Sequence, residues 1–259
     1  MTVSKLKIDI RRKKILERLR QDGKVSVVGL SKLLKVTPVT IRTDLANLEQ
    51  EGCLMRVQGG AVQVPASSLI SIEGGYNDAC KQQKESIASE IVSMIRDGDT
   101  LFMNSGTTCE RIAEALRIRR NLNIVTNSLR VATRLGMIQS FRVLLVGGEI
   151  NAHYGFTHGG DAQDQLSRYQ ADWAILSVDG VSAHGGVTTH HAEEAIIDRM
   201  MAAGAKQTLI AADASKLGRA GFSRVCECSE KLLLVSNEGC DKEVIAQLVS
   251  RGMKINLTK

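Results

Sequence analysis

The chain has 259 residues, enough for one large domain or two unequal domains that each have a core. Hydrophobic residues make up 43% and charged residues 24%, which is ordinary for a soluble globular protein. No apolar run approaches the ~20 residues that a membrane span needs, and the basic N-terminus lacks the apolar segment of a signal peptide. The composition therefore excludes a membrane protein, and we expect a cytoplasmic one.

The positive charge is concentrated near the N-terminus. Residues 1–64 hold 13 basic and 6 acidic residues, a net charge of +7, whereas the other 195 residues hold 21 basic and 22 acidic residues, a net charge of −1. This asymmetry indicates that the first segment binds a polyanion and that the rest has another task. Aromatic residues are only 3% of the chain, which disfavours a stacking platform for single-stranded RNA or DNA.

The six cysteines do not form a metal-binding pattern. Cys226 and Cys228 make a CxC, not the paired CxxC spacing of a zinc site. We expect free thiols and no cofactor.

The first 37 residues predict two helices. Ile10, Ile15, Leu16 and Leu19 recur at near-helical spacing, and the pattern stops at Asp22-Gly23, where glycine can cap a helix. Ser26 is a good N-cap for a second helix, whose inward side chains are expected to be Val27, Leu30, Leu33 and Leu34. Thr37 can cap a third helix, and Pro38 suits its first position.

This third helix, predicted over about 38–50, carries the functional signal. Ile41, Leu45 and Leu48 cluster on one arc and should face the core. The other arc presents short hydrogen-bonding groups and a guanidinium, which are the side chains that contact base edges and phosphates in a major groove. An amphipathic helix with an ordinary polar face is the alternative, but the local charge and the preceding turn favour DNA.

Two short strands around Gly59-Gly60 are predicted over 54–64, and a hairpin directly after such a helix is typical of a winged helix-turn-helix. Its side chains could reach backbone or minor groove. The predicted DNA-contacting residues are Thr37, Pro38, Val39, Thr40, Arg42, Thr43 and Asn47 of the helix region and Arg56 and Gln58 of the wing.

Residues 11–64 resemble the N-terminal domain of the DeoR family of bacterial transcriptional regulators. The resemblance is carried by Arg12, Ile15, VTPVTIRTDLANLEQEG at 36–52, and Gln58-Gly59-Gly60-Ala61. Family members commonly have two adjacent arginines before the Asp-Leu of the recognition helix, and here the pair is Arg42-Thr43.

A small, flexible segment over 65–80 is the expected linker, and residues 81–259 are the second predicted domain. Seven short apolar strands are predicted there, over 100–104, 122–126, 142–146, 173–178, 208–212, 231–235 and 254–257, and amphipathic helices are predicted over 84–95, 107–116, 128–137, 193–203 and 241–250. Regular alternation of this kind indicates an α/β domain with a largely parallel sheet.

Ligands of such sheets bind beyond the carboxyl ends of the strands, and the polar loops of this chain fall at those positions. The sharpest is Ser105-Gly106-Thr107-Thr108, where a strand leads directly into a helix. Small residues, hydroxyls and a helix N-terminus are what a phosphate cradle requires. The motif is neither a Walker loop nor GxGxxG, which disfavours ATP and NAD, and an ordinary capped turn is the alternative.

The resemblance to the DeoR family extends over this domain. It is carried by 84–88, the 105–108 loop, Thr126-Asn127-Ser128, Gly147-Gly148, 186–188, 193–195 and Asp213-x-Ser215-Lys216-x-Gly218. It implies a sensor domain related in fold to ribose-5-phosphate isomerase and glucosamine-6-phosphate deaminase, which senses phosphorylated sugars. The effector-binding residues that the resemblance implies are Lys84, Ser105, Gly106, Thr107, Thr108, Asn127, Gly147, Gly148, Asp179, Gly180, Glu193 and Lys216. Of these, the 105–108 loop would surround the phosphate and the two lysines would complement its charge. Asp179 and Glu193 would contact sugar hydroxyls.

His190-His191-x-Glu193-Glu194 could suggest a metal, but its spacing matches no HExxH-type site, and we predict none. The sequence thus favours a repressor of a carbohydrate-utilisation operon, a homodimer or larger homo-oligomer that binds double-stranded operator DNA under control of a sugar phosphate. The alternative is a sugar-phosphate isomerase or deaminase with an appended helical domain.

Overall fold

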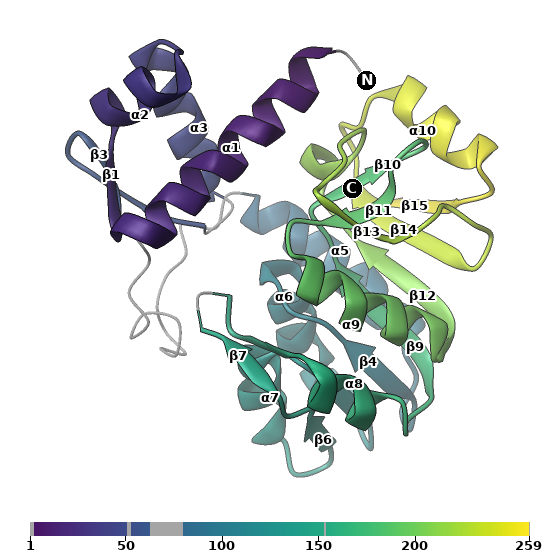
Figure 1. The fold of residues 1–259 in the computed structure, drawn as a ribbon. Coiled ribbons are helices and arrows are strands. Elements are labelled where there is room, and N and C mark those ends of the chain that lie inside the picture. Colours follow the sequence, from purple (N-terminus) through teal and green to yellow (C-terminus); the bar gives the residue numbers. More distant parts are fainter. Residues whose placement is uncertain (1–2, 51–52, 63–79, 153, 259) are drawn as a thin grey trace. The chain divides into compact units, whose positions relative to one another are not determined.

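The computed structural model describes residues 3–50, 53–62, 80–152 and 154–258, so the predicted linker lies almost wholly outside the described residues. The chain divides into two compact units, residues 1–79 and residues 80–259 (Figure 1). In the described part of the chain, no helix has the length and apolar character needed to cross a membrane.

The first unit consists of three helices and a small antiparallel sheet. Its elements are α1 (Val3–Asp22), β1 (Lys24–Ser26), α2 (Val27–Leu34), α3 (Pro38–Gln50), β2 (Met55–Val57) and β3 (Gly60–Val62). The predicted wing is confirmed, but it has a third strand, since β1 pairs with β3 in the order β1-β3-β2. Strand β1 was not predicted, because its three residues contain one apolar side chain and form a strand only against the edge of β3.

The core of this unit is formed largely by the predicted side chains. Ile15, Leu19, Val27, Leu30, Ile41, Leu45 and Leu48 are buried. Ser26 caps α2 by accepting the Gly29 N–H at 3.0 Å, as predicted. Leu33 was predicted to face inward, and this is wrong, because it is 59% exposed. Six residues at 100° each place Leu33 about 120° from Val27, outside the buried arc.

The second unit is an α/β domain around a seven-stranded sheet in the order β15-β14-β12-β9-β4-β5-β6, with every pair parallel. This confirms the predicted fold class. The strands are β4 (Thr100–Met103), β5 (Asn123–Thr126), β6 (Arg142–Leu145), β9 (Ala171–Ser177), β12 (Ala205–Ala211), β14 (Leu232–Asn237) and β15 (Lys254–Thr258).

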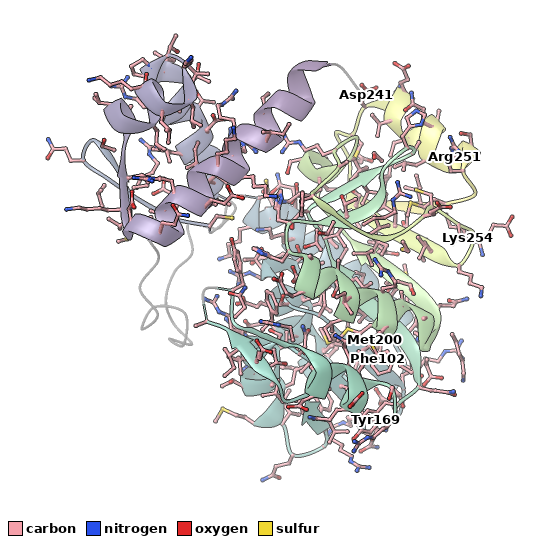
Figure 2. The ribbon with its side chains drawn as sticks, in the orientation of Figure 1. Phe102, Tyr169, Met200, Asp241, Arg251 and Lys254 are labelled. Carbon is pink, nitrogen blue, oxygen red and sulfur yellow. The ribbon has the colours of Figure 1, made fainter. Side chains whose placement is uncertain are left out.

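Helices cover both faces of this sheet (Figure 1). On one face lie α5 (Lys81–Met94), α6 (Thr107–Ala115) and α7 (Leu129–Gly136), and on the other lie α8 (Gly160–Leu166), α9 (Ala192–Ala203) and α10 (Lys242–Ser250). Alternate residues of β4 serve the two faces: Leu101 and Met103 pack toward α5 and α6, and Phe102 packs toward α9 beside Met200 (Figure 2). Burial on both faces explains why these strands are apolar throughout.

Shorter elements complete the domain. They are the helical turns η1 (Leu116–Ile118) and η2 (Ala214–Lys216), the hairpin of β7 (Glu149–Asn151) and β8 (Phe156–His158), and a second antiparallel sheet of β10 (Gly180–Ser182), β11 (Gly186–Thr189) and β13 (Ser223–Cys226). These strands and α8 were not predicted, because each is too short to show a hydrophobic period.

Candidate functional site

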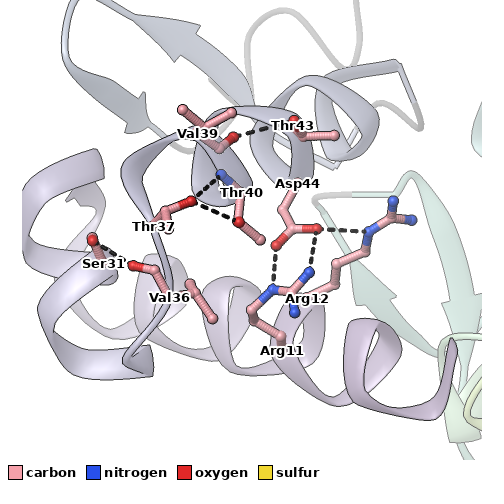
Figure 3. A network of polar contacts seen from close by, with 9 residues as sticks. All are labelled: Arg11, Arg12, Ser31, Val36, Thr37, Val39, Thr40, Thr43 and Asp44. Atoms are coloured by element: carbon pink, nitrogen blue, oxygen red, sulfur yellow. Dashed lines mark hydrogen bonds and ion pairs between the residues drawn. The ribbon is translucent and has the colours of Figure 1, made fainter. Parts of the chain in front are cut away.

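The start of α3 is fixed by the threonine hydroxyls that precede and begin it. Thr37 Oγ1 accepts the backbone N–H of Thr40 at 3.2 Å, and the two hydroxyl oxygens lie 2.9 Å apart (Figure 3). Pro38 occupies the first helical position, where a missing N–H costs nothing. The predicted cap is therefore confirmed, and it sets where the exposed face of α3 begins.

That exposed face carries most of the predicted DNA-contacting side chains. Val39, Arg42 and Thr43 are exposed, and Thr40 and Asn47 are half-buried. Thr43 Oγ1 donates to the Val39 carbonyl at 3.1 Å, which fixes the orientation of this exposed side chain (Figure 3). The arrangement offers apolar groups, hydroxyls and one guanidinium along a single strip, a combination that suits base edges and phosphates.

Asp44 joins α3 to α1 on the buried side. Its carboxylate, 2% exposed, accepts two hydrogen bonds from the Arg11 guanidinium, at 2.5 and 3.1 Å, and its Oδ1 lies 3.6 Å from Arg12 Nε (Figure 3). The hydrogen bond that Arg11 donates to Asp44 outweighs the effect of burial and raises the pKa of Arg11. This contact was not predicted, although a charged residue beside Ile41 and Leu45 on the inward arc could have revealed it.

The wing residues are tied to α3 less tightly. The Arg56 N–H donates to Glu49 Oε1 at 2.9 Å, and the Arg56 guanidinium lies 3.8 Å from Glu49 Oε2. Arg56 and Gln58 are both exposed, Arg56 in β2 and Gln58 in the turn that follows. Both side chains can therefore reach a molecule that lies along the wing.

In the second unit the connections reverse direction between two central strands. The chain runs outward from β4 through β5 to β6, and then crosses to β9 on the other side of β4. Loops that diverge from adjacent strands in this way leave a crevice at their carboxyl ends, where ligands of such sheets bind. The loop of residues 104–108 follows β4, and Asp179 follows β9, so the predicted phosphate loop and the carboxylate implied by the family resemblance lie at the same edge.

Asn104 holds the two sides of the crevice together. Its Nδ2 donates to the Ser177 carbonyl at 2.9 Å, and its Oδ1 accepts the Ser177 N–H at 2.8 Å. Gly106 then passes close to the same serine: a Cβ on Gly106 would lie 2.7 Å from Ser177 Oγ, and its φ is +122°. Only glycine fits both requirements, so the loop brings its backbone against β9 at the start of α6.

The buried Glu194 carboxylate contacts this loop, and the half-buried Asp179 shares a threonine hydroxyl with it. Ser105 Oγ donates to Glu194 Oε1 at 2.5 Å, and Thr189 Oγ1 lies 2.8 Å from Glu194 Oε2 and 3.1 Å from Asp179 Oδ2. Burial and the charge of Asp179 raise the pKa of Glu194 to about 7, against the hydrogen bonds from Ser105 and Thr189.

The pKa of Asp179 is shifted in the opposite direction from that of Glu194. Burial alone would raise its pKa, but His190 and Lys216, with the His190 N–H and the Thr189 hydroxyl, lower the pKa of Asp179 to about 2. Lys216 Nζ lies 3.8 Å from Asp179 Oδ1, and the His190 N–H donates to Oδ2 at 2.9 Å. The crevice therefore pairs a carboxylate that stays ionised with one that can carry a proton near neutrality.

A third carboxylate lies beneath them. Asp198 is fully buried and accepts the Asn104 Nδ2 hydrogen bond at 3.0 Å, and its Oδ1 has no hydrogen-bond partner among the residues that the structure describes. Burial and the charge of Glu194 raise the pKa of Asp198 well above its usual range. Burial likewise raises the pKa of Cys109, whose Sγ lies 3.2 Å from Asn104 Oδ1. Neutral forms of both groups are favoured there.

Glu194 and Asp198 were missed by sequence reasoning, which chose Glu193. The structure places Glu193 on the exposed side of α9, outside the cluster, because neighbouring helical residues differ by 100° in direction. The spacing of Glu194, Asp198 and the buried Met201 follows one face of the helix and could have revealed both carboxylates.

The remaining predicted residues are distributed around the same edge. Lys84 is buried near the start of α5, and α5 leads into the amino end of β4, so this helix begins at the carboxyl edge. Thr107 and Thr108 begin α6, and Gly180 begins β10 next to Asp179. Gly147 and Gly148 follow β6, where the Gly147 N–H donates to Gln165 Oε1 at 2.9 Å.

The β7–β8 hairpin, which ends at His158, lies beside this edge of the sheet. Asn127, which is fully buried, accepts the Thr157 N–H at its carbonyl at 2.8 Å and donates from Nδ2 to the Thr157 carbonyl at 3.1 Å. Tyr154, between the two strands, packs on His191 with ring centroids 4.1 Å apart. The hairpin is thus fastened beyond the end of β5 and reaches the start of α9.

Comparison with known proteins agrees with this architecture. Residues 11–65 match the DeoR-like helix-turn-helix domain, and residues 79–238 match the DeoR C terminal sensor domain. The glycerol-3-phosphate regulon repressor of Escherichia coli K12 is 34% identical over 205 residues, which cover 79% of this chain and 81% of that protein. The HTH-type transcriptional repressor GlcR of Bacillus subtilis strain 168 is 29% identical over 245 residues, 95% of this chain and 94% of that protein.

Among solved structures, ribose 5-phosphate isomerase A of Methanocaldococcus jannaschii matches with a TM-score of 0.40 and 14% identity, covering 53% of this chain and 55% of the isomerase. The two matched domains follow one another and together span most of the chain, and the Bacillus subtilis repressor aligns with 95% of it. The chain therefore belongs to the DeoR family and is a DNA-binding transcriptional regulator.

Proposed function

We propose that the protein represses a carbohydrate-utilisation operon and that a phosphorylated sugar, bound at the carboxyl edge of the seven-stranded sheet, controls its affinity for the operator. The observation that carries the proposal is the convergence of the loops after β4 and β9, where the 105–108 loop approaches Ser177 through Gly106. Hydroxyls, close backbone and the start of α6 suit a phosphate, and Asp179 and Glu194 suit sugar hydroxyls.

On the DNA side, the exposed strip of α3 enters the major groove and the wing lies along the backbone. Arg42 provides the guanidinium of the strip, and Arg56 provides that of the wing. A reader of this kind normally contacts two half-sites, so the active form is a homodimer or larger homo-oligomer. Lys84 and Lys216 balance the phosphate charge, and Lys216 exchanges part of its contact with Asp179 for the ligand.

Control of DNA binding requires the sugar phosphate to bind one arrangement of the protein better than another. The names of the relatives support the proposal, since one represses a glycerol-3-phosphate regulon, named after a small phosphorylated compound.

The proposal is tested with labelled duplex from the protein's own promoter region. Fluorescence anisotropy over a salt series should give a steep fall of affinity with salt, because phosphate contacts release counterions. A panel of five- and six-carbon sugar phosphates should contain one that changes this affinity, while its unphosphorylated sugar does not. Turnover of the same sugar phosphates without binding of the duplex would contradict the proposal and favour an isomerase or deaminase.

A further inference from the structure

The hydroxyl that should meet the phosphate is already engaged. Ser105, 5% exposed, donates its only hydroxyl hydrogen to Glu194 Oε1 at 2.5 Å. Glu194 Oε2 in turn lies 2.8 Å from the Thr189 hydroxyl. Since an ionised carboxylate only accepts hydrogen bonds, Ser105 has no hydrogen left for another acceptor while Glu194 is charged.

The charge of the crevice adds a second obstacle. Glu194 is 8% exposed, and the Thr189 hydroxyl that contacts it also lies 3.1 Å from Asp179 Oδ2. A phosphate ester carries close to two negative charges near neutral pH. Placed at Ser105, it would be the third negative group beside the buried Glu194, where like charges disfavour one another's ionisation, and Lys216 already faces Asp179.

We propose that Glu194 is the neutral acid when the ligand is bound. Its O–H donates to Ser105 Oγ, and the Ser105 hydroxyl turns to donate to a phosphate oxygen. The proton comes from solvent, so binding of a dianionic phosphate ester takes up one proton at each site where Glu194 was ionised. This inference rests on the proposed function, and it makes protonation of Glu194 the step by which the site accepts a dianionic ligand.

The groups around Glu194 allow this exchange near neutral pH. The other titratable acids of the cluster are Asp179 after β9, Asp198 in the next turn of α9, and the Cys109 thiol. Asn104 donates to Asp198 and accepts from the Cys109 thiol. His190 and Lys216 face Asp179. Burial and Asp179 raise the pKa of Glu194 to about 7, so both of its forms are populated in the free protein.

The test measures proton uptake directly. Members of the sugar-phosphate panel are titrated singly into the full chain by calorimetry, from pH 6.5 to 8.5, in pairs of buffers with different ionisation enthalpies. The expected wild-type result is a Kd that rises toward about tenfold per pH unit above pH 7, with about one proton taken up at pH 8. The ligand's own second ionisation, near pH 6, is common to every variant.

Two matched variants show whether the proton uptake comes from Glu194 or from other groups. Glu194→Gln keeps the shape and donates an N–H to Ser105 at any pH, so the Kd should lose its rise and the proton uptake should vanish. Glu193→Gln changes the exposed neighbour in the same turn and should behave like wild type. If Glu194→Gln does not fold, carboxyl ¹³C NMR of the wild type replaces it. The chemical shift of the Glu194 carboxyl should titrate with a midpoint near pH 7, and bound ligand should move this midpoint to higher pH.

Three outcomes would overturn the inference. Wild type and Glu194→Gln that share one pH dependence would show that Glu194 carries no ligand-linked proton, although the site binds sugar phosphates. Loss of the dependence in Asp198→Asn instead would assign the proton to Asp198. If no panel member binds any variant at any pH, the inference fails together with the proposed function.

Discussion

The Asp44 carboxylate holds the Arg11 guanidinium through two hydrogen bonds, at 2.5 and 3.1 Å, and so joins the third helix of the DNA-binding unit to the first. Asp44 lies on the buried side of α3, nearly opposite the exposed Arg42. A buried ion pair with fixed geometry thus orients the strip that is proposed to enter the major groove.

Replacing Asp44 with Asn keeps the shape and removes the charge. The N-terminal unit should lose about 1–3 kcal/mol of its free energy of unfolding, because the Arg11 and Arg12 guanidinium groups would face an uncharged amide. Operator affinity should fall too, since α3 is no longer held at one angle. Urea unfolding and anisotropy with operator duplex measure the two effects.

The matched control is Asp22→Asn, which removes the exposed partner of Arg18 within α1. An exposed i,i+4 pair contributes only about 0.3–0.5 kcal/mol, so this variant should remain close to wild type. Equal losses in both variants would count against an orienting role of Asp44.

Arg42→Ala should weaken operator binding by about 1–3 kcal/mol if the guanidinium binds a base, and should flatten the salt dependence if it binds phosphate. Arg42 is exposed, so the free energy of unfolding should hardly change. Arg42→Lys distinguishes the cases, because a lysine retains a phosphate contact but not a bidentate base contact. Unchanged affinity and salt slope in the alanine variant would exclude Arg42 from the interface.

Gly106→Ala should destabilise the C-terminal unit and abolish the response to the sugar phosphate, while leaving DNA affinity intact. Its Cβ would lie 2.7 Å from Ser177 Oγ and 2.9 Å from Ser177 Cβ, in a backbone of φ +122°. Gly98→Ala is the control, since φ is +89° and, in the described part of the chain, no atom beyond its chain neighbours lies within 4 Å of the added carbon. Thermal unfolding and effector titration of both variants separate steric overlap from backbone strain, and a normal effector response in Gly106→Ala would argue against the loop as the phosphate site.

Stability should depend on pH in opposite directions for the two carboxylates of the crevice. Glu194 keeps its proton up to about pH 7 in the folded chain and loses it near 4.5 when unfolded, so its contribution falls as the pH rises from 4.5 to 7. Asp179 ionises near 2 when folded and 3.8 when unfolded, so its contribution is full above 3.8 and is lost as the pH falls toward 2.

Urea unfolding of wild type at pH 5 and pH 8 checks the first sign. Wild type should lose stability at pH 8 relative to Glu194→Gln, whose side chain does not ionise, and Glu193→Gln should follow wild type. A wild type that gains stability over Glu194→Gln between these pH values would contradict the raised pKa.

Local patterns were enough to predict most of the framework. Ile41, Leu45 and Leu48 recur with the helical period, Thr37 and Pro38 mark the start of α3, and continuous apolar runs predicted all seven parallel strands. These signals extend over a few residues, so they do not depend on contacts with residues distant in sequence. The charge of residues 1–64 similarly indicates a polyanionic partner by composition alone.

The strands β1 and β10 and the choice between Glu193 and Glu194 depended on partners distant in sequence. Thr189 and Ser105 meet Glu194 only because β11 and the end of β4 converge on the start of α9. Local sequence patterns therefore suffice for the two-part organisation, the parallel sheet and the polar loops at its strand ends. They do not predict which carboxylates lie together or which of them stays ionised, because burial and charge pairing arise between residues that come together only on folding.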